Sequence, residues 1–266
     1  MVGDNLSSLE KALAKTETDA DAAFKTATAT VICLKKFRAA AKVGNIRELR
    51  KTIESAEQAI TALSQELIRA KEGWTFDEET YLSGKAFISE IVETARQMGV
   101  KIFEQDDRLY CYPSLIRILP NERSILIDKV REKRLRPLVL VGHLKELQNK
   151  PIRFNSKAFL ESMYSAYSIA VKTRGKERSG TEPVVPLVKI YDLLTLLPGQ
   201  SKDYSKQEFA RDLYLLDQSG NRNTKSGLIV SFHTATGRES PSKVIPIVTR
   251  DGEVKGYYGI SFTQEE

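Results

Sequence analysis

The stretch IRELRKTIESAEQAITALSQEL, residues 46–67, decides the architecture of the first part of the chain. Its apolar residues recur at alternating steps of three and four, the heptad pattern of a helix that packs along one stripe. The members of this seam are Ile46, Leu49, Ile53, Ala56, Ile60, Leu63 and Leu67. Gly73 is a suitable end for such a helix. The pattern therefore predicts a long coiled-coil helix.

Leu, Phe and Ala residues at helical spacing predict an earlier helix that ends near Lys42. The Gly44-Asn45 pair that follows is a stop signal and a turn. Two long helices joined there form an antiparallel hairpin, and a third helix that closes at Gly99 would pack against it. The predicted caps are Asp4 or Asn5 for the first helix and Asp77 for the third.

This helical part admits two interpretations. It is a docking arm for a partner protein, or it is a self-contained bundle that buries its own seam. The run of Thr and Ala at residues 26–30 makes one face of the first helix weakly apolar, which leaves room for a partner. No residue in this part suggests catalysis.

A small antiparallel β-meander is predicted next, because β-branched and aromatic residues alternate with turn signals. Its three strands are residues 100–103, 108–119 and 124–127, with turns at 105–107 and 120–122. Pro113 indicates a bulge or an edge position in the middle strand. A basic connector, residues 129–137, leads into a helix over 138–148 that has Pro137 in its first turn.

The last part begins with a helix capped by Ser156. A short helix starts at Pro186 and stops at Pro198-Gly199, and a third is capped by Tyr204-Ser205 and ends at Gly220. Strands are predicted over 227–233, 243–248 and 255–262, with a turn at Asp251-Gly252.

Three helices followed by a β-hairpin is an order that resembles the winged helix-turn-helix superfamily, over about residues 156–262. The resemblance implies that the helix 205–218 enters the major groove and that the wing touches the DNA backbone or minor groove. Its outer face would carry Lys206, Gln207 and Arg211. The same helix also holds three acidic residues and has a net charge of −1, which is equally typical of a protein-docking winged helix. The polar loop 221–225 is better suited to phosphate contacts.

Charge is divided unevenly along the chain. Lys and Arg total 41 against 35 Asp and Glu, but residues 1–99 carry a net charge of −1 and residues 100–266 a net charge of +7. Within the second part, residues 129–178 hold 13 basic and 4 acidic residues. A regional basic excess is typical of a nucleic-acid-binding face, although a solvated Lys/Arg-rich surface has the same composition.

The composition excludes several classes of protein. With two Cys and two His, neither a disulfide framework nor a Cys-based zinc site is available. No apolar run approaches the roughly 20 residues that span a bilayer, and the first residues do not form a signal peptide, so a cytoplasmic protein with no membrane contact is expected. Nothing in the sequence calls for a cofactor.

The combined prediction is an α+β protein with a helical hairpin or bundle (1–99), a β-meander with a basic connector and helix (100–150) and a winged-helix-like domain (151–266). We expect a non-enzymatic nucleic-acid-binding subunit of a larger assembly, with DNA as the favoured ligand and a protein partner on the N-terminal helices. The predicted phosphate contacts are Lys129, Arg131, Lys133, Arg134, Arg136, Arg174, Lys176, Arg178, Lys206, Arg211, Arg222 and Lys225.

Two other functions stay open. The first is an adaptor that docks onto an ATPase or nuclease partner through the helical hairpin and the winged-helix-like part. The second is a metal-dependent nuclease, for which the acidic residues beside the meander are the candidates: Glu104, Asp106, Asp107 and Asp128. Turn chemistry explains Asp106 and Asp107 better than catalysis does. A Gly-rich phosphate loop, a nucleophile elbow and an HExxH helix are absent from the sequence.

Overall fold

The computed structural model describes residues 8–105, 108–150, 154–174, 183–235 and 240–264. It confirms the α+β class, with long N-terminal helices followed by antiparallel sheets. The chain forms two compact units built from alternating segments: unit 1 comprises residues 1–94, 118–125 and 132–142, and unit 2 comprises the remainder. Within the described parts, no helix combines the length and the apolar character needed to cross a bilayer.

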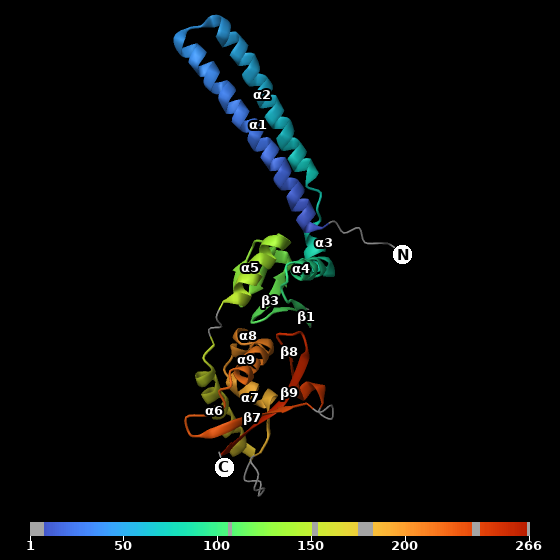
Figure 1. The fold of residues 1–266 in the computed structure, drawn as a ribbon, viewed down its shortest axis with the longest axis vertical. Coiled ribbons are helices and arrows are strands. Elements are labelled where there is room, and N and C mark those ends of the chain that lie inside the picture. The colour runs from blue at the N-terminus through green and yellow to red at the C-terminus, as the bar shows by residue number, and fades with distance from the viewer. Residues whose placement is uncertain (1–7, 106–107, 151–153, 175–182, 236–239, 265–266) are drawn as a thin grey trace, which may run out of the picture. The chain divides into compact units, whose positions relative to one another are not determined.

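The predicted helical hairpin is present in unit 1 (Figure 1). It consists of α1 (Leu9–Val43) and α2 (Ile46–Gly73), which together are called the arm. Gly44 ends α1 in the left-handed conformation with φ of 71°, and the Asn45 side chain accepts a hydrogen bond from the Glu48 N–H at 3.1 Å to begin α2. Ser8 caps α1, whereas Asp4 and Asn5, the predicted caps, lie outside the described residues.

The predicted seam of the arm is confirmed for some of its residues, Ala56 among them, and wrong for others. Apart from Leu9 at the start of α1, the buried residues are small: Ala23, Thr30 and Ala40 on α1, and Thr52 and Ala56 on α2. The Thr30 hydroxyl donates a hydrogen bond to the Ala59 carbonyl of the opposite helix at 3.2 Å, so the two backbones approach closely. Four of the seven seam residues are instead 44–68% exposed; they are Ile46, Ile53, Ile60 and Leu67. Leu49 and Leu63 are half-buried, so the seam turns only its other half toward α1.

The predicted third helix is two helices, α3 (Glu78–Ser83) and α4 (Lys85–Gln97), because the chain is extended at Gly84. Within unit 1, Glu90 of α4 anchors the start of α1. Its carboxylate accepts the backbone N–H of Leu9 at 2.9 Å and the hydroxyls of Ser8 and Tyr81. Further along the chain, α5 (Pro137–Asn149) begins at the predicted proline.

The first sheet has five strands rather than the three predicted. They follow one another in chain order as β1 (Phe103–Gln105), β2 (Arg108–Cys111), β3 (Ser114–Leu119), β4 (Ser124–Ile127) and β5 (Val130–Glu132). The run predicted as one strand over 108–119 is a tight hairpin that turns at Tyr112-Pro113 and pairs Cys111 with Ser114. A short 3-10 helix (Pro120–Glu122) replaces the next predicted turn, and β5 lies in the predicted connector.

The second sheet and four helices complete unit 2 (Figure 1). The helices are α6 (Ser156–Arg174), α7 (Leu187–Leu194), α8 (Gln200–Asp203) and α9 (Lys206–Gln218). The strands are β6 (Val185–Pro186), β7 (Leu228–Thr234), β8 (Ile245–Val248) and β9 (Val254–Gln264). β9 is the central strand and pairs antiparallel with the other three. Phe209, Tyr257 and Phe262 lie at the centre of the core between helices and sheet.

Two details of this part differ from the prediction. The side chain of Asn155, rather than Ser156, accepts the Ala158 N–H at 3.0 Å at the start of α6. The elements β6 and α8 were not predicted. Ser205 does cap α9 as predicted, in a reciprocal capping box with Glu208.

Candidate anion-binding site

Two cations of the predicted basic stretch belong to ion pairs inside unit 1. Arg134 lies 2.5 Å from the carboxylate of Glu132, and its hydrogen bonds lower the pKa of Glu132 to about 2. Arg136 contacts Glu10 at 2.7 Å and Glu17 at 2.6 Å, both on α1. Arg136 fastens the chain to the base of the arm, and the Arg134–Glu132 pair is a local contact, so both cations serve the fold of unit 1.

The other predicted phosphate contacts are scattered. Five are exposed: Arg131, Lys133, Lys206, Arg222 and Lys225. Lys129 and Arg211 are held by carboxylates of unit 2, as described below. Lys176, Arg178 and the side chain of Arg174 lie outside the described residues. The structure therefore gathers no single site from the described members of the predicted set.

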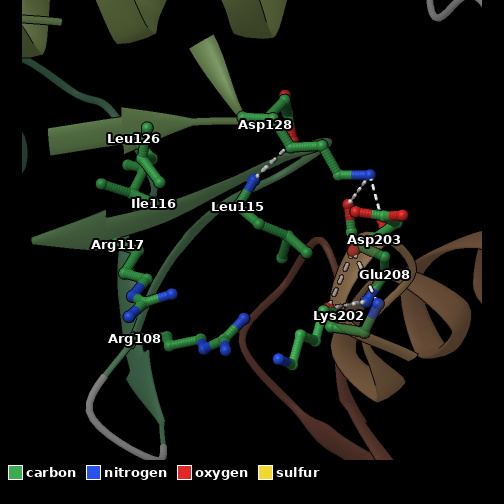
Figure 2. A pocket seen from close by; sticks show the side chains of 11 residues that line it. Arg108, Leu115, Ile116, Arg117, Leu126, Asp128, Lys202, Asp203 and Glu208 are labelled. Atoms are coloured by element: carbon green, nitrogen blue, oxygen red, sulfur yellow. Dashed lines mark hydrogen bonds and ion pairs between the residues drawn. The ribbon is translucent and has the colours of Figure 1, made fainter. Parts of the chain in front are cut away.

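A different group of cations does come together, in a cavity of about 220 Å³ within unit 2 (Figure 2). β2, β3 and the turn between β4 and β5 form one side, and α8 and the start of α9 form the other. Leu115, Ile116 and Leu126 supply its apolar lining. A water molecule occupies about 30 Å³ of liquid, so the cavity has room for a phosphate group with part of its hydration shell.

Three cationic side chains extend into this space: Arg108 of β2, Arg117 of β3 and Lys202 of α8 (Figure 2). The register that pairs Leu109 with Ile116 puts Arg108 and Arg117 at the next opposed positions of the hairpin. Like charges directly opposite each other on paired strands are destabilising. A bound anion would remove that repulsion.

None of these three cations has an ion pair among the described residues, although three carboxyl-bearing residues line the same cavity. Asp128 accepts the guanidinium of Arg211 at 2.9 Å and the Leu115 N–H at 3.0 Å. Glu208 is occupied by Lys129 and Ser205, and Asp203 offers its main-chain carbonyl to Lys129 (Figure 2). The carboxylates of Asp128 and Glu208 are thus engaged around the rim, whereas Asp203 contributes only its main-chain carbonyl.

Glu208 is the main support of this rim. Its carboxylate lies 3.1 Å from the Lys129 ammonium and accepts the Ser205 N–H at 2.7 Å and the Ser205 hydroxyl at 2.9 Å. Burial would raise its pKa, but these hydrogen bonds outweigh burial and hold the pKa below its ordinary value. Glu208 therefore stays ionised and fixes both the start of α9 and the Lys129 side chain.

A second support joins the sheet to α9. Arg211 contacts Asp128 at 2.9 Å and Asp212 at 3.0 Å, and the Tyr204 hydroxyl donates to Asp212 at 2.9 Å. Burial is the largest influence on Asp212 and raises its pKa, with Arg211 acting in the opposite direction. The side chain of Arg211 is only 23% exposed, so the predicted outward orientation on the third helix does not hold.

Sequence reasoning missed Arg108, Arg117 and Lys202 because all three lie outside the densest run of basic residues. The available signal was Arg117, a single charge in the apolar run Leu115-Ile116-Arg117-Ile118. If Tyr112-Pro113 is taken as a hairpin turn, Arg108 falls opposite Arg117. That pairing could have been found from the sequence.

The two described candidates for a nuclease, Glu104 and Asp128, are not assembled as a metal site. Asp106 and Asp107 lie outside the described residues, and Asp128 is engaged by Arg211. Across the segments that the structure describes, no group of three or more His, Cys, Asp or Glu is placed to hold a metal ion. Comparison with protein-family models, curated protein sequences and solved structures finds no match for this chain.

Proposed function

We propose that this protein binds nucleic acid, with DNA as the favoured form, as a non-enzymatic cytoplasmic subunit of a larger assembly. Unit 2 would hold a backbone phosphate between Arg108, Arg117 and Lys202. The observation that carries the proposal is the opposed pair of arginines, joined by a lysine and left without carboxylate partners among the described residues of the cavity. Arg forms bidentate hydrogen bonds with phosphate oxygens, and such contacts position a protein on nucleic acid without reading its sequence.

The order of elements in unit 2 supports a winged-helix-like placement on DNA. α6, α7 and α9 precede the antiparallel pair β7 and β9, as the resemblance requires. The three acidic residues of α9 also argue less strongly against DNA binding than the composition of this helix suggests. Glu208 and Asp212 are paired as described above, and Asp217 lies 2.8 Å from Lys255. Lys206 remains exposed at the start of α9, 5.8 Å from the centre of the Tyr191 ring.

The test compares a pocket variant with a variant of equal charge. Arg108→Gln/Arg117→Gln removes two cations from the cavity, and Lys157→Gln/Lys172→Gln removes two exposed cations from α6. Binding of a labelled DNA duplex by the full chain is measured by fluorescence anisotropy over a range of salt concentrations. Hydrogen bonds to charged groups contribute about 1.5–3 kcal/mol each, so the pocket variant should lose at least tenfold in affinity. The slope of log affinity against log salt should fall by about 0.9 for each phosphate group that the variant no longer binds.

A second readout separates binding from folding. Inorganic phosphate should raise the melting temperature of the unaltered chain and of the α6 variant, but not that of the pocket variant. Without phosphate, the pocket variant should melt no lower than the unaltered chain, because it relieves repulsion between like charges. Equal DNA affinity in the two double variants would falsify the proposal.

The structure also favours a second function, protein docking through the arm. Leu34 and Phe37 of α1 line one groove, of about 400 Å³, with Ile53 and Ile60 of α2. Ile46 lies seven residues before Ile53, and Leu67 lies seven residues after Ile60, so both are on the same side of α2 as the groove. We call these six residues the apolar face; contiguous exposed apolar surface of this kind marks interaction sites. A helical segment of a partner protein fits such a groove.

If the arm docks a partner protein, substitutions in the apolar face should release that partner. Ile53→Ser/Ile60→Ser in the full chain should release proteins that co-purify with it. Ile32→Ser/Ile68→Ser is the control, because those residues are 50% and 51% exposed but lie outside the groove. Quantitative mass spectrometry of the co-purified proteins measures the difference. Retention of the same partners by both variants would contradict docking at this face.

A further inference from the structure

The turn of the arm carries a concentration of positive charge that the net charge of the N-terminal part conceals. Residues 35–51, called the basic tip, contain seven basic residues and one acidic residue. The basic residues are Lys35, Lys36, Arg38, Lys42, Arg47, Arg50 and Lys51. The flanking parts of the same helices, residues 9–34 and 52–73, contain five basic and eight acidic residues together. The arm is therefore polarised, with its positive charge at the turn.

All seven cations are exposed, and none has an ion pair among the described residues. Elsewhere in unit 1, charged side chains of the arm do find partners. Arg69 lies 3.2 Å from Glu66, and Glu10 and Glu17 contact Arg136. The nearest acidic residue in sequence, Glu48, is a single carboxylate among seven cations. The positive charge of the tip is thus left without neutralisation within the described part of the chain.

Helix stability does not account for all of these cations. Lys42 is in the last turn of α1, where a positive charge is favourable for the helix dipole. Arg47 is in the first turn of α2, where a positive charge opposes the dipole, and Arg50 and Lys51 follow in the next turn. Asn45 already satisfies the Glu48 N–H. Arg47 therefore costs helix stability in the isolated protein, and Arg50 and Lys51 gain nothing from the dipole, so the cluster points to a ligand.

We infer that the basic tip binds the phosphate backbone of a nucleic acid duplex, as a contact separate from the cavity of unit 2. A duplex presents one negative charge per about 1.7 Å of its axis, a density that can neutralise closely spaced cations on both helices. The tip has two exposed large apolar side chains, Val43 and Ile46, and its one aromatic residue, Phe37, is half-buried in the groove between α1 and α2. Insertion into a membrane surface relies on a broad apolar face that includes Trp, Phe or Leu, so the tip suits a duplex better than a lipid surface.

The inference is independent of the cavity, because its cations lie in unit 1 and those of the cavity lie in unit 2. The tip variant is Arg47→Gln/Arg50→Gln/Lys51→Gln in the full chain. The control is Lys11→Gln/Lys25→Gln/Lys71→Gln, which removes three exposed cations from parts of the same helices outside the tip. Each is compared with the unaltered chain for binding to a labelled DNA duplex and to vesicles that contain phosphatidylserine.

The tip variant should lose at least tenfold in duplex affinity, and its salt slope should fall by about two to three, at about 0.9 for each phosphate group it no longer binds. The control should bind nearly as the unaltered chain does. The tip variant should also melt no lower than the control, because it removes Arg47, whose charge opposes the α2 dipole, and takes away two exposed charges that the dipole does not favour. Equal duplex binding by the two variants overturns the inference, as does loss of vesicle binding alone.

Combining the variants distinguishes this inference from the proposed function. If only the cavity variant weakens binding, the tip contact is wrong and the cavity contact stands. If only the tip variant weakens binding, the reverse holds. A combined variant with the product of both losses supports two separate contacts on one duplex. Absence of duplex binding by the unaltered chain at low salt overturns both.

Discussion

The arm and the core of unit 2 bury opposite kinds of side chain. In the arm, the buried residues along the hairpin are Ala and Thr, and most large aliphatic residues are half-buried or exposed. In unit 2, the large aromatic residues Phe209, Tyr257 and Phe262 are less than 2% exposed. Small residues allow two helices to approach closely, whereas a sheet covered by helices leaves a space that large rings fill. A heptad pattern therefore identifies a helix without saying which of its stripes is buried.

The largest effect should follow from truncating the core of unit 2. Phe209→Ala removes a ring that lies 5.5 Å from the Tyr191 ring, centre to centre, and should destabilise unit 2 by about 3–5 kcal/mol. The matched change in the arm, Ile60→Ala, should alter stability by less than about 0.5 kcal/mol because Ile60 is 50% exposed. Urea denaturation followed by circular dichroism measures both. A large loss for Ile60→Ala would show that the apolar face is covered in solution.

The arm should instead be destabilised when a small buried side chain is replaced by a larger one. Ala56 is 4% exposed, and Ala56→Leu should destabilise the hairpin by about 1–3 kcal/mol because the longer side chain would interfere with the close approach of the two helices. Ala62→Leu is the control, since Ala62 is exposed on the same helix. The helical signal at 222 nm during thermal denaturation reports the difference. Equal melting of the two variants would mean that the helices are not closely packed.

The two glycines on either side of α2, Gly44 and Gly73, should differ in their tolerance of a side chain, and this difference in stability is smaller. Gly44→Ala should cost about 1–2 kcal/mol, because φ is 71° there and a Cβ meets nothing within 4 Å that could compensate. Gly73→Ala should be neutral or stabilising by up to about 1 kcal/mol, because Gly73 is the last residue of α2 and a Cβ would make only ordinary contacts. Opposite signs in the two melting curves are expected.

The smallest effect concerns pH. Hydrogen bonds from Ser205 and Lys129 hold the pKa of Glu208 below its ordinary value despite burial. A carboxyl group with a lowered pKa stabilises the folded state above its unfolded pKa, near 4, and loses that contribution as pH falls through the folded pKa. Glu208→Gln should therefore flatten the stability loss below about pH 4. Urea denaturation at several pH values measures this loss. If the variant lost as much stability at low pH as the unaltered chain, the pKa of Glu208 would not be lowered by these hydrogen bonds.

Local signals in the sequence predicted much of the fold. Gly44-Asn45, Pro137 and Ser205 mark helix ends where the structure has them, because caps and left-handed turns depend on neighbouring residues alone. The failures concern choices that depend on distant residues. The exposure of Ile53 could not be foreseen because it depends on how closely α1 approaches α2.

The candidate site was harder to predict than the fold for the same reason. Charge density drew attention to residues 129–136, but Arg134 and Arg136 are neutralised by ion pairs that only the folded chain forms. Arg108 and Arg117 are each isolated in sequence and meet only through the register of β2 and β3. A count of charges cannot distinguish a paired cation from an unpaired one, and binding depends on the unpaired ones.

The chain passes back and forth between the two units, so most truncations would remove residues from both units. A stop codon after residue 117 would remove residues 118–125 and 132–142 from unit 1, and with Arg136 gone Glu10 and Glu17 would lose their cation. The hairpin, by contrast, is a contiguous segment of the sequence, from Leu9 to Gly73. Recombination could therefore exchange the arm, with its apolar face and basic tip, as a single segment, provided that the contacts of Leu9 with Glu90 and of Glu10 and Glu17 with Arg136 were kept.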